Sequence, residues 1–126
     1  IIWQKNYGGT STEVAKAVYH CSDGGFVFSG YTLSNDGDVN GNHGSTDIWV
    51  FKTNASGIIQ WQNCIGGTDA EDSYEIQETP NGDFVIAGKS TSSNGNIPAN
   101  NGYEDFILAK LDNTGNLLWV KNYGGT

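Results

Sequence analysis

The chain has 126 residues and a formal net charge of −8, with six lysine and arginine residues against fourteen aspartate and glutamate residues. This charge repels phosphate backbones and argues against nucleic-acid binding, whereas it is compatible with cations or neutral glycans. Eighteen glycines and 12% aromatic residues indicate a turn-rich, folded chain rather than a disordered one, and no apolar run is long enough to span a bilayer.

One stretch of sequence occurs three times and organises the chain. It contains Trp3, Trp61 or Trp119, and each copy ends in Gly-Gly-Thr. The copies lie 58 residues apart without insertion, which is typical of repeated supersecondary units that bury apolar faces against one another. Because methionine is absent and two units make only a short array, we interpret the chain as a segment of a longer protein.

The first half of each unit is predicted to form a hairpin. Residues 1–10 alternate between apolar and polar positions, which predicts a single edge or outer strand. Residues 13–21 have a partly helical composition, but they and their counterpart, residues 71–79, lead into Asp23-Gly24 and Asn81-Gly82. These dipeptides favour a two-residue hairpin turn, and a hairpin requires a strand on each side. We therefore predict strands at both places.

The second half of each unit contains strands that are apolar on both faces. Residues 26–31 and 84–88 follow the hairpin turns, and residues 48–52 and 106–111 follow a long loop. Strands that do not alternate must be covered on both sides. A second hairpin turn then leads to the tryptophan-containing strand, which completes a unit of four strands: a polar inner strand, two buried central strands and a half-polar outer strand.

This profile predicts an all-β fold built from four-stranded antiparallel β-propeller blades, because stacked blades bury their central strands twice. Residues 1–10 would be an outer strand of a preceding or neighbouring blade, residues 11–68 the first blade and residues 69–126 the second. All three would belong to a larger propeller or a self-assembling repeat array. The alternatives are a β-sandwich, whose central strands alternate, and a β-solenoid, whose period is usually shorter and without tight hairpins.

Four motifs of the first unit are distinctive. They are Trp-x-x-x-Tyr-Gly-Gly at residues 3–9, Asp-Gly-Gly-Phe-Val at residues 23–27, Ser-Asn-Asp-Gly-Asp-Val-x-Gly-Asn-His-Gly at residues 34–44 and Asp-x-Trp-Val-x-Lys at residues 47–52. Together they resemble the long-blade propeller repeats of secreted Bacteroidetes proteins. The resemblance implies export through type IX secretion and a location outside the cell or at its surface, and it implies no particular chemistry.

The loop of residues 35–43 is the sharpest local feature that could carry chemistry. It places oxygen-bearing side chains at every second position, as calcium-binding loops do, and a further aspartate follows five residues later. The predicted metal ligands are Asp36, Asp38, Asn40, Asn42 and Asp47. Calcium is therefore the one candidate cofactor. The alternative is a surface loop rich in Asx turns, whose side chains cap their own backbone.

Four acidic residues recur at fixed places in the repeat. Asp47 and Asp105 both precede a predicted buried strand, and Glu13 and Glu71 both follow Gly-Gly-Thr. A carboxylate repeated in this way is typical of a structural hydrogen-bond acceptor. We expect these side chains to accept hydrogen bonds from backbone amides of loops and connectors.

No catalytic constellation stands out. His20 and His43 lie at different places in the repeat, and neither is accompanied by a nucleophile and a carboxylate at repeated positions. A nucleophilic triad is therefore not indicated. Glu75 and Glu78 would suit a pair of glycosidase carboxylates, but no other feature of the sequence supports that reaction.

We therefore predict a non-enzymatic extracellular or cell-surface propeller module that acts as a structural scaffold, adhesion or binding unit. Its partners would be neighbouring blades or identical chains, in a closed ring or an open filament. The main alternative is a glycan-binding, lectin-like propeller in which Trp49, Tyr31 and Tyr103 stack on sugars, and a glycoside-hydrolase-type propeller is the less favoured third. A lectin needs an aromatic ring exposed beside polar groups, whereas a scaffold buries its rings.

Overall fold

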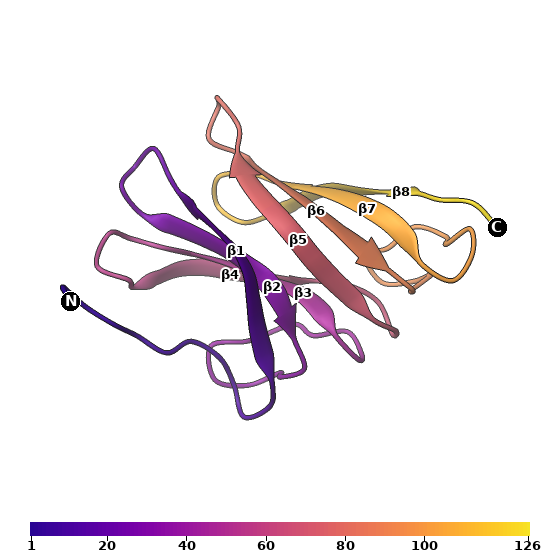
Figure 1. Cartoon of the computed structure of the whole chain (residues 1–126), viewed down its shortest axis with the longest axis horizontal. Helices are drawn as coiled ribbons and strands as arrows, with labels where there is room; N and C mark the ends of the chain where they lie inside the picture. Colours follow the sequence, from indigo (N-terminus) through magenta and orange to yellow (C-terminus); the bar gives the residue numbers. More distant parts are fainter.

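The computed structural model describes residues 1–126 as two four-stranded antiparallel sheets without a helix (Figure 1). Sheet 1 contains β1 (Glu13–His20), β2 (Phe26–Thr32), β3 (Asp47–Thr53) and β4 (Ile59–Ile65). Sheet 2 contains β5 (Glu71–Glu78), β6 (Phe84–Ser90), β7 (Asp105–Leu111) and β8 (Leu117–Tyr123). Strands follow sequence order within each sheet, so the predicted all-β class and the four-stranded units are confirmed. With every element a strand, the chain has no helix that could cross a membrane.

The hairpin between β1 and β2 is confirmed, but the predicted two-residue turn is wrong. The N–H of Gly24 donates to the carbonyl of Cys21, and only Gly24 has a positive φ, of 88°. A two-residue type I′ turn needs positive φ at both central positions. Asp23 keeps an ordinary backbone conformation, and its carboxylate accepts the N–H of Gly25 at 2.9 Å. The hairpin therefore closes through a longer turn in which the aspartate caps the loop.

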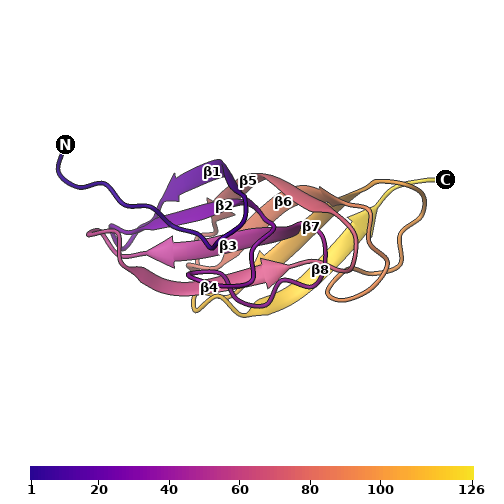
Figure 2. The ribbon, with the colours of Figure 1, turned by 90° about the horizontal axis from the view of Figure 1, so that it is seen from below.

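The two sheets stack on each other and share one apolar core. Figure 2, a view from below, shows sheet 1 overlapping sheet 2. Strand β5 lies against β1, β2 and β3. Sheet 1 contributes Val27, Ile48, Val50 and Ile65, and sheet 2 contributes Ile76, Phe84, Ile86, Ile107, Ala109 and Leu111. Two polar pairs cross the same junction: the Ser73 hydroxyl donates to the Ser29 hydroxyl at 3.1 Å, and Lys16 Nζ lies 3.2 Å from Asp72 Oδ2.

The outer face of sheet 1 carries a second, smaller core. Trp49 and Phe51 of β3 pack there with Phe28 of β2, under Val39 of the β2–β3 loop and Tyr7 of the N-terminal segment. Every residue of β3 is consequently buried. The predicted burial of the central strands on both faces is thus confirmed for sheet 1.

Sheet 2 differs because nothing covers its second face. Residues of β6 and β7 alternate between buried and partly exposed positions. Phe106 and Tyr123 on the uncovered side are each about half exposed. The second covering that these central strands require is therefore absent from sheet 2, as expected where two units cover only the face that they share.

Residues 1–10 do not form the predicted strand, because no free strand lies beside them to pair with. They nevertheless occupy the place on sheet 1 that β4 occupies on sheet 2. The ring of Trp3 lies 6.3 Å from that of Phe26. One repeat later in the chain, the ring of Trp61 lies 5.6 Å from that of Phe84. The N-terminal segment thus keeps the stacking contacts of an outer strand without its backbone pairing.

The two tryptophans of the sheets give a first test of this arrangement. Trp61 packs across the junction, whereas Trp119 lies on the uncovered side of sheet 2, with Lys121 Nζ 5.2 Å from its ring. We expect Trp61→Ala to lower the free energy of unfolding by about 3 kcal/mol. The matched Trp119→Ala variant should lose less than about 1 kcal/mol. Urea denaturation at low protein concentration measures both; equal losses would contradict the assigned faces.

The turn between β7 and β8 is capped by one carboxylate. Asp112 Oδ1 accepts the N–H groups of Thr114 and Asn116, each at 2.9 Å. These hydrogen bonds, led by the one from Asn116, lower the pKa of Asp112 to about 2. Asn54 occupies the same place in the first unit, and its side-chain oxygen accepts the N–H groups of Ser56 and Ile58 at 3.0 Å.

This cap predicts an acid-dependent contribution to stability. An aspartate in an unfolded chain has a pKa of about 3.9, so the folded pKa of Asp112 is the lower one. The stabilisation is therefore present above about pH 4 and is lost as the pH falls towards about 2. In Asp112→Asn, which copies Asn54, this part of the pH dependence should disappear from unfolding free energies measured across that range. An unchanged pH profile would show that the carboxylate does not cap the turn.

Candidate functional site

Loop 35–44, which connects β2 to β3, is fastened to the connector that precedes sheet 1. Asp36 accepts the N–H and the hydroxyl of Thr10, each at 2.8 Å. Asp38 Oδ2 accepts the N–H of Gly8 at 3.0 Å, and the Gly8 carbonyl accepts the N–H of Asp38 at the same distance. The hydrogen bonds from Thr10 hold the pKa of Asp36 below its usual range. Both carboxylates therefore bind the backbone of the preceding repeat.

The other predicted metal ligands also contact the protein itself. Asn40 donates its N–H to Gln62 Oε1 at 3.2 Å, and Asn42 accepts the N–H of Gly44 at 2.9 Å. Asp47 accepts the N–H of His43 at 3.1 Å. No group of three or more histidine, cysteine or acidic side chains is placed so that it could hold a metal ion. Calcium binding at this loop remains a prediction. The side chains of Asp36, Asp38, Asn42 and Asp47 serve here as hydrogen-bond partners, whereas Asn40 takes part through its backbone.

The second unit makes the same contacts without charge. Asn94 Oδ1 accepts the N–H of Thr68 at 2.9 Å, and Asn96 Oδ1 accepts the N–H of Gly66 at 3.1 Å. These asparagines stand one repeat after Asp36 and Asp38. An amide oxygen is therefore sufficient to accept these backbone N–H groups. Both loops use the hydrogen bonds to connect one unit to the Gly-Gly-Thr segment before it.

The four recurring acidic residues behave as predicted. Glu13 accepts the N–H of Gly9 at 3.0 Å, and Glu71 accepts the N–H of Gly67 at 2.9 Å. In the same way Asp47 and Asp105 accept the N–H groups of His43 and Asn101, at 3.1 and 2.8 Å. Their expected role as acceptors for connector and loop amides is confirmed.

Asp47 and Glu71 are both fully buried and lie on either side of Gly66 at the junction between the sheets. Asp47 Oδ2 lies 2.6 Å from His43 Nδ1, whereas its Oδ1 has no hydrogen-bond partner. Burial raises the pKa of Asp47, and the charge of Glu71 adds to the rise, while the contacts with His43 oppose it. Keeping Asp47 ionised in this buried place therefore costs some stability.

Sequence reasoning missed Gln62, which ties loop 35–44 to β4. Its Oε1 accepts the indole N–H of Trp49 at 3.0 Å, and its amide group donates to the carbonyl of Asn40 at 3.1 Å. Position 120, one repeat later, is valine, so the second unit needs another tie. Asn122 supplies it by donating to the carbonyl of Pro98 at 2.8 Å. Only the recurrence of glutamine at positions 4 and 62 hints at this role in the sequence.

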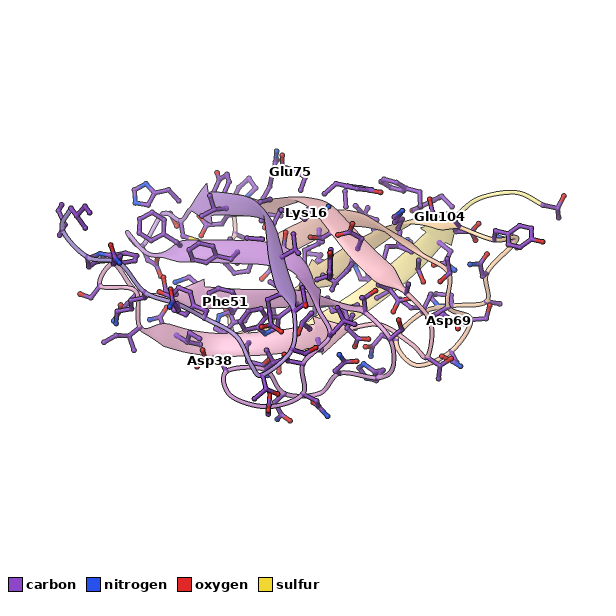
Figure 3. All side chains as sticks on the ribbon, turned by 60° about the horizontal axis from the view of Figure 1, so that its bottom comes forward. Lys16, Asp38, Phe51, Asp69, Glu75 and Glu104 are labelled. Atoms are coloured by element: carbon purple, nitrogen blue, oxygen red, sulfur yellow. The ribbon has the colours of Figure 1, made fainter.

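A groove of about 540 Å³ lies on the outer face of sheet 1, between the N-terminal segment and strands β1 to β3. We call it the aromatic groove. Its rings belong to Trp3, Tyr7, Phe26, Phe28, Trp49 and Phe51. In Figure 3, Phe51 and Asp38 both lie in the half of the molecule that sheet 1 forms. The groove is mainly apolar, and its nearest charged groups are Lys5 and Glu13.

The three aromatic residues of the lectin hypothesis do not form one platform. Trp49 is buried, and its indole N–H is already bonded to Gln62. In the strand register Tyr31 is one position away from the partner of Trp49, so the two rings point to opposite faces of sheet 1. Tyr103 is 95% exposed and stands in the β6–β7 loop of the other sheet.

The residues considered for hydrolysis are also separated. Glu75 pairs with Ala87 and Glu78 with Phe84, which places the two carboxylates on opposite faces of sheet 2. Glu78 accepts the N–H of Ser22 at 3.0 Å. Figure 3 shows Glu75 projecting outwards, away from the junction where Lys16 lies.

Comparison with known proteins adds no family. No protein-family model matches the chain, and no curated protein matches it either. The arguments about function therefore rest on the geometry described above.

The junction between the sheets predicts a strong requirement for glycine at position 66. A Cβ there would overlap Asp47 Oδ1 and Glu71 Oε2, two buried atoms that cannot move into solvent. We expect Gly66→Ala to destabilise the fold by about 1–3 kcal/mol, the usual cost of overpacking. Gly125→Ala is the matched control, because a Cβ at that glycine meets nothing within 4 Å. Equal thermal midpoints for the two variants would contradict the described junction.

Proposed function

We propose that the chain is a non-enzymatic scaffold module of propeller type, in which each sheet is a blade and the surface of the stacked blades serves for adhesion or binding. The main observation behind the proposal is that the same stacking contacts occur at two places in the chain. Sheet 1 stacks on sheet 2, and residues 1–10 repeat the tryptophan and Gly-Gly-Thr part of that arrangement on sheet 1. Such head-to-tail repetition is how blades and other repeat arrays are built.

The polar side chains of the repeat support a structural role. Asp36, Asp38, Glu13 and Glu71 are hydrogen-bonded to backbone amides of the connectors, and Asp47 is bonded to its own loop. A catalytic group must instead be available to a substrate. These residues hold successive units in register, which is the work of a scaffold. Location outside the cell or at its surface is part of the proposal and follows from the sequence resemblance.

A glycan-binding module is the second candidate. Tyr103 is 95% exposed and lies beside Asn100 and Asn101, so an aromatic face stands next to amide groups. That combination suits a sugar, which stacks on a ring and bonds to neighbouring polar groups. The ring stands alone, however, and no cavity encloses it. We therefore rank this function below the scaffold.

Tandem fusions test the scaffold proposal. Copies are joined so that residues 117–126 of one copy serve as residues 1–10 of the next, which preserves the repeat of 58 residues. Stacked units stabilise one another through nearest-neighbour contacts, so the thermal midpoint should rise as copies are added. Calorimetry measures this rise. The control fusion carries Phe106→Asp in the first copy, which places a charge on the face that the next copy would cover. A midpoint that is independent of copy number would refute the proposal.

A further inference from the structure

We infer that the uncovered face of sheet 2 docks into the aromatic groove of a second copy of this chain, in head-to-tail order. The inference rests on the proposed stacking of the sheets as blades, and it identifies the binding partner as a second copy of the chain. We call the uncovered face the open face. Its apolar side chains are those of Val85, Ala87, Phe106, Leu108, Trp119 and Tyr123.

The junction inside the chain shows what covers this kind of face. Ile48 and Ile65 of sheet 1 stand one repeat before Phe106 and Tyr123, and both isoleucines are 0% exposed under sheet 2. Phe106 is 49% exposed and Tyr123 is 51% exposed. These repeat positions are thus buried in sheet 1, which is followed by another sheet, and partly exposed in sheet 2, which is not. Lys89, Lys110 and Lys121 stand beside these side chains on the open face. Exposed large apolar side chains at positions that are buried one repeat earlier mark an interaction site.

The aromatic groove is the matching acceptor. Sheet 2 receives sheet 1 on a surface that includes Phe84 and Ile86, which are buried. Phe26 and Phe28 stand one repeat earlier in sheet 1, and both are only half-buried in the groove. The groove therefore leaves open part of the surface that the second sheet buries against the first, while Trp49 and Phe51 on the same face are already covered.

Two side-chain pairs show that the open face and the groove are complementary. Inside the chain Ser29 meets Ser73 at 3.1 Å. The corresponding residues of the open face and the groove are Ala87 and Ala15, so a polar pair is replaced by two small apolar residues.

The second pair changes in the same way. Lys16 meets Asp72 inside the chain at 3.2 Å. The corresponding residues are Tyr74, which is 51% exposed on sheet 2, and Val14, which lines the groove. In both pairs the two partners have changed together from polar to apolar. This joint change is expected if Tyr74 and Ala87 of one copy meet Val14 and Ala15 of another.

The N-terminal segment occupies part of the docking place. Its Trp3, Lys5, Asn6 and Tyr7 are identical to the residues at the same positions of β8, so either segment fits. Residues 1–7 are held by the indole N–H of Trp3, which donates to the Ala55 carbonyl at 3.2 Å, and by the Tyr7 hydroxyl, which donates to the Gly57 carbonyl at 2.6 Å. Strand β8 is paired with β7 along its whole length. Residues 1–7 are therefore the part that gives way when a second copy docks.

Disulfide trapping between two copies tests the inference. Chains with Ala15→Cys and chains with Ala87→Cys are mixed and oxidised. The Ser29–Ser73 contact shows that side chains at such positions are close enough for a disulfide. A covalent dimer should form in the mixture and not in either variant alone, since the native Cys21 and Cys64 are buried. Removal of residues 1–7 from both chains should increase the dimer yield several-fold.

Ser29→Cys combined with Ser73→Cys in one chain provides the control. Closure of this internal disulfide shows that the sheets stack as described, independently of any second copy. If it closes and the mixed chains give no more dimer than each variant alone, the inference is refuted and the stacking of the sheets stands. If the internal disulfide itself fails to form, the proposed blade arrangement fails with it.

Discussion

The structure depends on one constraint: a sheet whose central strands are apolar on both sides must be covered on both faces. Sheet 2 covers one face of sheet 1, and the N-terminal segment and loop 35–44 cover the other face in part, which leaves Phe26 and Phe28 half-buried. Sheet 2 meets this requirement on one face only. The partial exposure of Phe106 and Tyr123, and the groove over Phe26 and Phe28, are two consequences of the same shortage of neighbours.

Apolar stacking alone does not fix how far one sheet slides or turns on the next, because the hydrophobic effect is non-directional. The Gly-Gly-Thr connector fixes the relative position and orientation of the two sheets through directional hydrogen bonds. Its N–H groups are bound by Glu71 and by the asparagines of the following loop, and its first glycine packs between two buried carboxylates. The pairing of glycine and carboxylate therefore sets the register between units, which explains why both recur at every repeat.

Much of this architecture could be predicted from the sequence. The period of the tryptophans, the turn dipeptides and the apolar runs together identified all eight strands of the two sheets. The recurrence of Glu13 and Asp47 one repeat later identified backbone acceptors. The strand predicted for residues 1–10 failed because strand structure depends on a pairing partner, which the alternation of residues does not reveal. The oxygen-rich spacing of loop 35–44 was equally ambiguous, since oxygen side chains at alternate positions can bind a cation or accept hydrogen bonds from backbone amides. Asp36 and Asp38 accept hydrogen bonds from the backbone of Thr10 and Gly8.

The difference between the internal junction and the free faces has a physical rationale. Within one chain the connector keeps the sheets close, so the effective concentration is high and polar pairs such as Lys16–Asp72 can set orientation without supplying much affinity. Two separate chains must first overcome the loss of translational and rotational freedom, which favours apolar area over exposed ion pairs. Tyr74 and Ala87 on the open face, and Val14 and Ala15 in the groove, are residue types that suit this second situation, and they stand one repeat away from the polar pairs within the chain.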